Sequence, residues 1–196
     1  MDVKKIAIKL YTANDGYDGE TFIPVFHRWI QNQALPGHLL IDVADYAHVP
    51  RGPGTVLISS EANIYMERTE GRLALLYQRK LPLAGDFSQR LAEVTAEALK
   101  LAGMLESEDL SPKLSFKTDE ILIRLDDRLL APNNEKTFAA TKPAITQLAT
   151  ALFKSDFKLT PNISPQTLFE VRIQSSSSPK LADLQDRVTA APALSR

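Results

Sequence analysis

The most constraining feature of this sequence is the stretch from residue 39 to residue 80, in which apolar and polar side chains alternate. Alternation with a period of two predicts strands that have one buried and one exposed face. We divide the stretch into three strands, residues 39–49, 55–67 and 72–80, separated by turns that contain Gly52, Pro53 and Gly71. Strands joined by such short connections pair with one another, so this stretch predicts a sheet.

The phase of the alternation assigns the side chains of these strands to two faces. An apolar set consists of Leu39, Ile41, Val43, Ala47, Val49, Val56, Ile58, Ala62, Ile64, Met66, Leu73, Leu75 and Tyr77. If this set faces one core, the opposite face gathers Asp42, Tyr46, His48, Glu61, Asn63, Tyr65, Gln78 and Lys80. Strands at residues 3–11 and 168–174 would add Lys5, Lys9, Glu170 and Arg172 if they join the sheet in the same sense.

Three other segments have helical periodicity, at residues 21–33, 87–106 and 133–153. The second is the clearest, because Asp86 and Gln89 match a capping box. The order of elements predicts an α+β fold. We expect a two-layer sandwich with a mixed, mostly antiparallel sheet, about three helices on one face and a partly open polar face. Residues 1–174 form one domain in this interpretation. The tail at residues 175–196, rich in Ser, Pro and Ala, is predicted to be mostly disordered, and the alternative is a short helix around residues 181–188.

Composition narrows the classes of function. The chain has 196 residues and no cysteine, which excludes disulfides, thiolate metal sites and cysteine nucleophiles. Its 23 basic and 24 acidic residues give a net charge of −1, which argues against nucleic-acid binding. The N-terminal segment lacks the apolar core of a signal peptide, and apolar runs are shorter than a membrane span. We therefore expect a cytosolic protein with no membrane contact.

One candidate site consists of Asp42, His48 and Glu61 on the predicted open face. Two carboxylates and an imidazole suit a divalent metal, and the same groups suit acid–base catalysis, since His titrates near neutrality. No spacing motif of a known metal site accompanies them. The alternative is that these three side chains solvate an exposed face of the sheet.

A second candidate consists of tyrosines on the same face. Tyr46 and Tyr65 would stack on a base or an aromatic ligand, with Asn63 beside them and Lys80 near a phosphate. The same tyrosines suit a protein interface, where this residue type is enriched. Packing of tyrosines across neighbouring strands is the structural alternative.

The predicted order of strands and helices resembles that of the acyl-CoA-dependent N-acetyltransferases. Their pyrophosphate loop would fall at residues 78–87, where this sequence has Gly85 but not the closely spaced glycines, and where Asp86 has the wrong sign for a pyrophosphate. The resemblance implies a splayed pair of parallel strands with a cofactor slot between them. No site residue is carried over from that family.

The sequence therefore leaves three functions open. We favour a non-enzymatic cytosolic binding or assembly protein that uses the open sheet face to hold a protein partner or a second copy of itself. The alternatives are a metal-dependent or acid–base enzyme centred on Asp42, His48 and Glu61, and an acyltransferase-like enzyme. The sequence names no cofactor.

Overall fold

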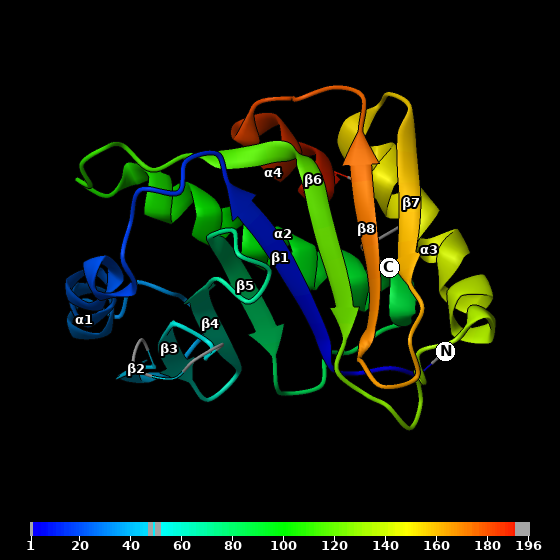
Figure 1. Ribbon diagram of the computed structural model, residues 1–196, viewed down its shortest axis with the longest axis horizontal. Coiled ribbons are helices and arrows are strands. Elements are labelled where there is room, and N and C mark those ends of the chain that lie inside the picture. The colour runs from blue at the N-terminus through cyan, green and yellow to red at the C-terminus, as the bar shows by residue number, and fades with distance from the viewer. Residues whose placement is uncertain (1, 47–48, 50–51, 191–196) are drawn as a thin grey trace.

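The computed structural model describes residues 2–46, 49 and 52–190. Its centre is one eight-stranded sheet in the order β2-β3-β4-β5-β1-β6-β8-β7, and every pairing between these strands is antiparallel (Figure 1). The strands are β1 (Ile6–Thr12), β2 (Leu40–Asp45), β3 (Thr55–Ser59), β4 (Ala62–Glu67), β5 (Ala74–Arg79), β6 (Phe116–Leu125), β7 (Phe157–Asn162) and β8 (Phe169–Ser175). The helices are α1 (Ile23–Gln31), preceded by the short 3-10 helix η1 (Gly19–Phe22), α2 (Phe87–Ser107), α3 (Glu135–Phe153) and α4 (Leu181–Ala190).

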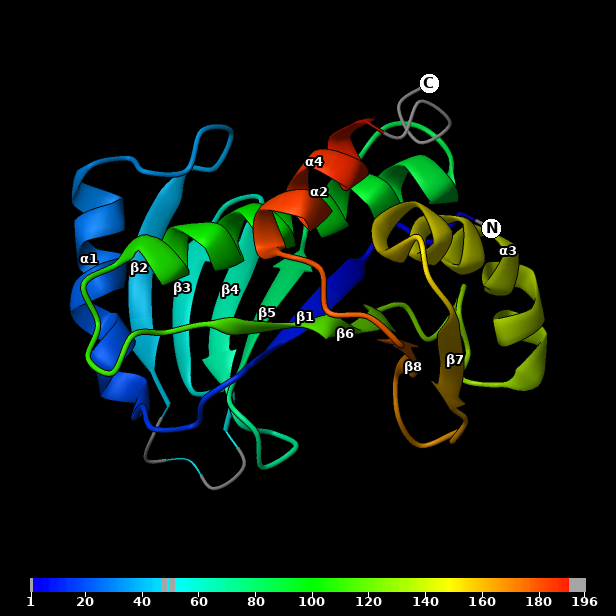
Figure 2. The same ribbon diagram turned by 90° about the horizontal axis from the view of Figure 1, so that it is seen from above.

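The helices form the second layer, on one side of the sheet. Figure 2 shows α2, α3 and α4 along this side, and α1 beside β2 at one end. Helix α2 packs on β1 and β5, α3 packs on β7 and β8, and α4 packs on α2 and α3. The core fills the space between the layers with buried side chains such as Ile8, Tyr77 and Ile123. The predicted α+β sandwich with one helix-free face is confirmed, with a fully antiparallel sheet among the described strands.

The first prediction that was wrong is the single strand at residues 55–67. This segment forms two strands, β3 and β4, joined by a two-residue turn at Ser60 and Glu61. The Ser59 hydroxyl donates to the carbonyl of Ala62 at 2.8 Å and accepts from its N–H at 3.0 Å, which closes the turn. Because the chain reverses direction at this turn, the alternation of side chains between the two faces does not continue from β3 into β4 as it would in one strand. Leu57 therefore faces the helices, and Val56 and Ile58 lie on the helix-free face, opposite to their predicted positions.

The second correction concerns the start of β2. The register between β2 and β3 shifts between Leu40 and Asp42, which is the signature of a β-bulge. Leu40 is consequently buried, whereas Leu39 and Ile41, predicted to be core residues, are 59% and 56% exposed. Beyond the bulge Val43 is on the helix side and Asp42 on the helix-free face, as predicted.

The C-terminal segment also differs from the expectation of a mostly disordered tail. Residues 181–190 form α4, which buries Leu184 and Val188. Its Gln185 amide donates to the carbonyl of Leu99 in α2 at 2.9 Å, and Arg187 donates to the carbonyl of Leu152 in α3 at 2.7 Å. This helix therefore belongs to the folded layer.

Candidate binding face

The helix-free side of the sheet is organised in cross-strand rows, which follow from the register of the eight strands. The central row runs from β2 to β7 through Ala44, Val56, Tyr65, Leu76, Lys9, Leu122, Arg172 and Thr160. Residues two positions along each strand form parallel rows on the same face. Side chains that are far apart in the sequence are therefore neighbours here.

A buried ion pair lies at the middle of this face. Lys9 Nζ is 2.6 Å from Glu67 Oε1, and the two side chains are only 3% and 2% exposed. The same ammonium group is 3.1 Å from Glu70 Oε1, on the turn between β4 and β5. The side chain of Glu70 is 32% exposed, so it closes the cluster on the solvent side.

Two arginines extend this cluster across the sheet. Glu120 on β6 accepts hydrogen bonds from Arg72 at 2.9 and 3.0 Å and from Arg172 on β8. Arg172 also donates to Glu70 Oε2 at 2.7 Å. Both guanidinium groups lie over the ring of Tyr11, at 3.7 Å from its centroid for Arg72 and 5.2 Å for Arg172. The ring is thereby buried on the face of the sheet that is free of helices in the described part of the chain.

The charges of this cluster shift the pKa values of its members. Burial by itself would raise the pKa of Glu70, but the charge of Lys9 and the hydrogen bonds from Arg172, Lys9 and Tyr11 lower it to about 2. Burial and the neighbouring Glu70 carboxylate raise the pKa of Tyr11 above its ordinary value. Arg72 and Arg172 likewise outweigh burial at Glu120 and lower the pKa of that carboxyl group. With these shifts Glu70 and Glu120 are charged at neutral pH, and Tyr11 keeps its proton.

A second polar group occupies the neighbouring part of the face. Asn63 Nδ2 donates to the Tyr65 hydroxyl at 3.0 Å, and that hydroxyl donates to Gln78 Oε1 at 2.8 Å. Gln78 Nε2 donates to Asp126 at 2.7 Å, and Asp126 also accepts from Arg124 Nε at 2.7 Å. The structure thus places the predicted Asn63 and Tyr65 side by side, in a hydrogen-bonded chain with partners that hold the tyrosine in one orientation.

The predicted carboxylates serve the backbone of the edge strand β2. Asp42 Oδ1 accepts from the N–H of Val43 at 2.8 Å, and Glu61 Oε2 accepts from the N–H of Leu39 at 2.7 Å. The Ser60 hydroxyl also donates to Glu61, and this bond lowers the pKa of Glu61. His48, like Ala47 of the predicted apolar set, lies outside the described residues. Within the described ranges no group of three His, Asp or Glu side chains is arranged to hold a metal, and the three-residue site stays a prediction.

The remaining predicted residues lie at opposite ends of the strands. Lys80 follows β5, and its ammonium group donates to the carbonyl of Ser59. Tyr46 follows β2 at its other end, where its N–H donates to the carbonyl of Gly54 at 3.0 Å, and its side chain is 40% exposed. Tyr46 lines a cavity of about 340 Å³ together with Arg68 and Leu73.

Sequence reasoning missed the centre of the cluster. The alternation placed Lys9 and Arg172 on this face, but it gave no role to Tyr11, Glu70 or Glu120. Glu70 belongs to a turn and so has no strand phase. Tyr11 and Glu120 could have been assigned to this face by extending the alternation of side chains along β1, where Tyr11 is two positions after Lys9, and along β6.

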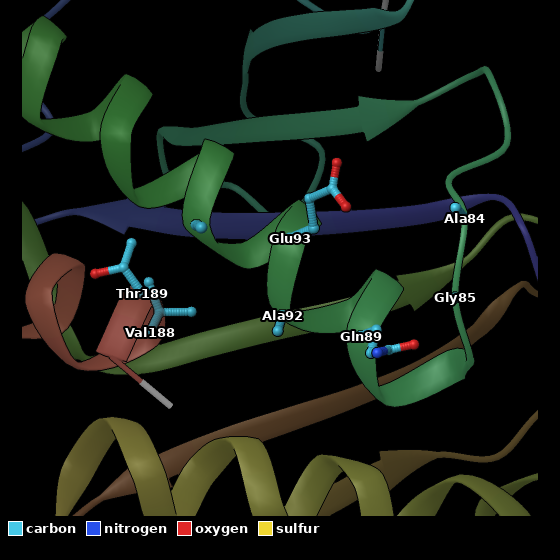
Figure 3. Close-up of a pocket in the computed structure, with 8 residues that line it drawn as sticks. Ala84, Gly85, Gln89, Ala92, Glu93, Val188 and Thr189 are labelled. Atoms are coloured by element: carbon cyan, nitrogen blue, oxygen red, sulfur yellow. The ribbon is translucent and has the colours of Figure 1, made fainter. Parts of the chain in front are cut away.

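Two further cavities differ in their chemistry. One of about 360 Å³ opens on the helix-free face beside the cluster, and it is lined by Glu70, Leu122, Thr160, Pro161, Asn162, Glu170 and Arg172. Another, of about 440 Å³, lies on the helix side between α2 and α4 (Figure 3). Small side chains such as Ala84, Ala92 and Ala96 line much of the second cavity. The charged cluster thus adjoins the cavity on the helix-free face.

The directions of the strands bear on the acyltransferase resemblance. The parallel strand pair implied by the acyltransferase resemblance does not occur among the described strands. None of the helices in the described part of the chain is both long enough and apolar enough to cross a bilayer. Neither a family model nor a curated protein matches this sequence.

Proposed function

We propose that this chain is a non-enzymatic cytosolic binding protein, which holds a partner protein on the helix-free face of its sheet. The observation that carries the proposal is the polar and aromatic surface around Tyr65. Its side chain is half-buried and is held by Asn63 and Gln78, so its orientation is fixed before a partner arrives. Preorganised tyrosines give large contact areas at a low entropic cost.

The partners of the charged groups support binding over catalysis. A general base or a nucleophile needs a group that is free to reach a substrate. Here Glu67 and Glu120 are engaged by cations, and Asp42 and Glu61 each accept a backbone N–H.

The test replaces both tyrosines of the proposed interface, Tyr46→Ala and Tyr65→Ala, in one variant. Sedimentation velocity measures self-association, and affinity capture from the cells that produce the chain measures binding to other proteins. We expect the double variant to keep the circular dichroism spectrum of the wild type and to lose its association. A matched control, Glu93→Ala, changes an exposed residue of α2 on the helix side and should associate normally.

Two results would contradict the proposal. In the first, the folded double variant associates as strongly as the wild type, so the interface lies elsewhere. In the second, Glu93→Ala alone abolishes association, which would move the interface to the helix layer. Self-association that is lost only in the double variant would identify the partner as a second copy of the chain.

A further inference from the structure

The carboxylate of Glu70 occupies a set of donors that other elements of the fold provide. Its Oε1 accepts from Lys9 Nζ at 3.1 Å and from the Tyr11 hydroxyl at 2.9 Å, and its Oε2 accepts from Arg172 Nη2 at 2.7 Å. These donors lie on two strands of the sheet, β1 and β8, which flank β6, whereas Glu70 lies on the turn between β4 and β5. Three charged or polar donors that converge on two oxygens are what a carboxylate-binding site requires.

The donors remain assembled if Glu70 moves away. Lys9 keeps Glu67, at 2.6 Å, and Arg172 keeps Glu120. The connected ion pairs contain four cations, Lys9, Arg72, Lys117 and Arg172, and four carboxylates, Glu67, Glu70, Asp119 and Glu120. Without Glu70 the four cations face three carboxylates, so the vacated position attracts one anion.

The backbone of the turn that carries Glu70 is held on both sides of this residue: the N–H of Thr69 donates to Glu67 at 2.7 Å, and the N–H of Gly71 donates to the carbonyl of Arg68 at 2.8 Å. Arg68 donates to the carbonyls of Asp15 and Tyr17 at 2.6 and 2.9 Å, which anchors the first residue of the turn. Gly71 has a φ of 74°, a conformation that glycine adopts without strain. Rotation of the Glu70 side chain can therefore open the site while the strands stay in place.

Room for a ligand adjoins this site. The cavity of about 360 Å³ has Arg172 and Glu70 in its wall, and Leu122, whose apolar side chain is on the same face of the sheet, lines it beside them. Glu170 also lines it, and its carboxylate disfavours a second negative charge on a ligand. The lining suits one carboxylate attached to a small apolar body.

We propose that Lys9, Tyr11 and Arg172 form a binding site for a monocarboxylate, and that Glu70 occupies this site as an internal competitor. A ligand in the adjoining cavity displaces Glu70 and takes its hydrogen bonds. This inference rests on the proposed function, because the site lies on the same face of the sheet. It specifies the chemical group that the face recognises, a carboxylate such as that of an acidic side chain. The test of the carboxylate site needs no partner protein, so the carboxylate site and the protein-binding function can be refuted independently of each other.

The experiment uses benzoate as the probe and benzamide as its neutral control. Titrations are followed by the ¹H–¹⁵N NMR signals of β1 and β8 in the wild type, Glu70→Gln and Glu70→Gln with Arg172→Gln. We expect Glu70→Gln to bind benzoate at least about tenfold more tightly than the wild type, because an internal competitor acts at a high effective concentration. Benzamide should leave the signals unchanged, and the double variant should lose the binding.

The contrary outcomes are specific. If folded Glu70→Gln shows no benzoate-induced shifts in β1 and β8, the cluster is an internal ion network and the site does not exist. Equal binding with and without Arg172→Gln would place the benzoate elsewhere and would also overturn the proposal. If Glu70→Gln does not fold, Glu70→Asp replaces it. This variant keeps the charge but shortens the competitor, and it should bind benzoate more tightly than the wild type.

Discussion

Removing either member of the buried ion pair between Lys9 and Glu67 should destabilise the protein. The remaining partners of each group predict which of the two substitutions costs more free energy of unfolding. Replacement of Lys9 by Met keeps an unbranched apolar side chain of similar length, so the change is mainly one of charge. Glu67 then stays buried with one hydrogen bond, in which its Oε2 accepts from the N–H of Thr69 at 2.7 Å. Breaking a buried pair in this way costs about 3–5 kcal/mol of the free energy of unfolding.

The reciprocal change should cost less. In Glu67→Gln the Lys9 ammonium group keeps Glu70 at 3.1 Å and the Thr69 hydroxyl at 3.2 Å. Its charge is therefore still compensated, and we expect a loss of about 1–2 kcal/mol, the cost of a weakened hydrogen bond to a charged group. The double variant, Lys9→Met with Glu67→Gln, contains neither charge and should be more stable than Lys9→Met alone.

The assay is equilibrium unfolding in urea, followed by the fluorescence of Trp29, the one tryptophan of the chain, which is 4% exposed. With a slope of about 2 kcal/mol per molar urea, a loss of 4 kcal/mol moves the midpoint down by about 2 M. Lys5→Met, at an exposed position just before β1, is the matched control and should stay within about 0.5 kcal/mol of the wild type. A midpoint for Lys9→Met within about 0.5 M of the wild type would refute the reasoning, and so would a larger loss for Glu67→Gln.

Three further predictions concern other parts of the fold. His38 is buried with its Nε2 2.9 Å from the hydroxyl of Tyr77, and burial lowers its pKa below 6.5, so stability should fall as the pH drops below about 6.5. His38→Phe should flatten this part of the pH profile of the unfolding midpoint. Leu184→Ala should lower the free energy of unfolding by about 2–4 kcal/mol, whereas a disordered tail would give no change in urea unfolding. Because Asp42 and Glu61 bind backbone N–H groups, native mass spectra with and without a chelator should coincide, and a mass removed by the chelator would instead support the metal site.

The sequence predicted those parts of the sheet in which local pattern and turn chemistry agree. In β4 apolar and polar side chains alternate, and β5 pairs with it in a regular register, so Asn63, Tyr65 and Gln78 lie on the predicted face although Leu76 interrupts the polar set. The error in β3 arose because the turn at Ser60 and Glu61 contains none of the glycine, proline or asparagine residues that mark most tight turns. The turn is closed instead by the Ser59 side chain, a contact that periodicity does not report.

The candidate site depends on contacts that spacing cannot reveal. Tyr11 and Glu70 are 59 positions apart, and Glu70 and Arg172 are 102 apart, yet the order of strands in the sheet brings all three together. The opposite case is that of Asp42 and Glu61. Their residue types suggested a metal site, but their carboxylates are used as acceptors for unpaired N–H groups at the edge of the sheet. A residue type states which bonds a side chain is able to make, whereas the topology decides which of these bonds are already made. In our proposal the bonds of Glu70 are exchangeable, because its donors lie on strands whereas its carboxylate lies on a turn and can leave them to a ligand.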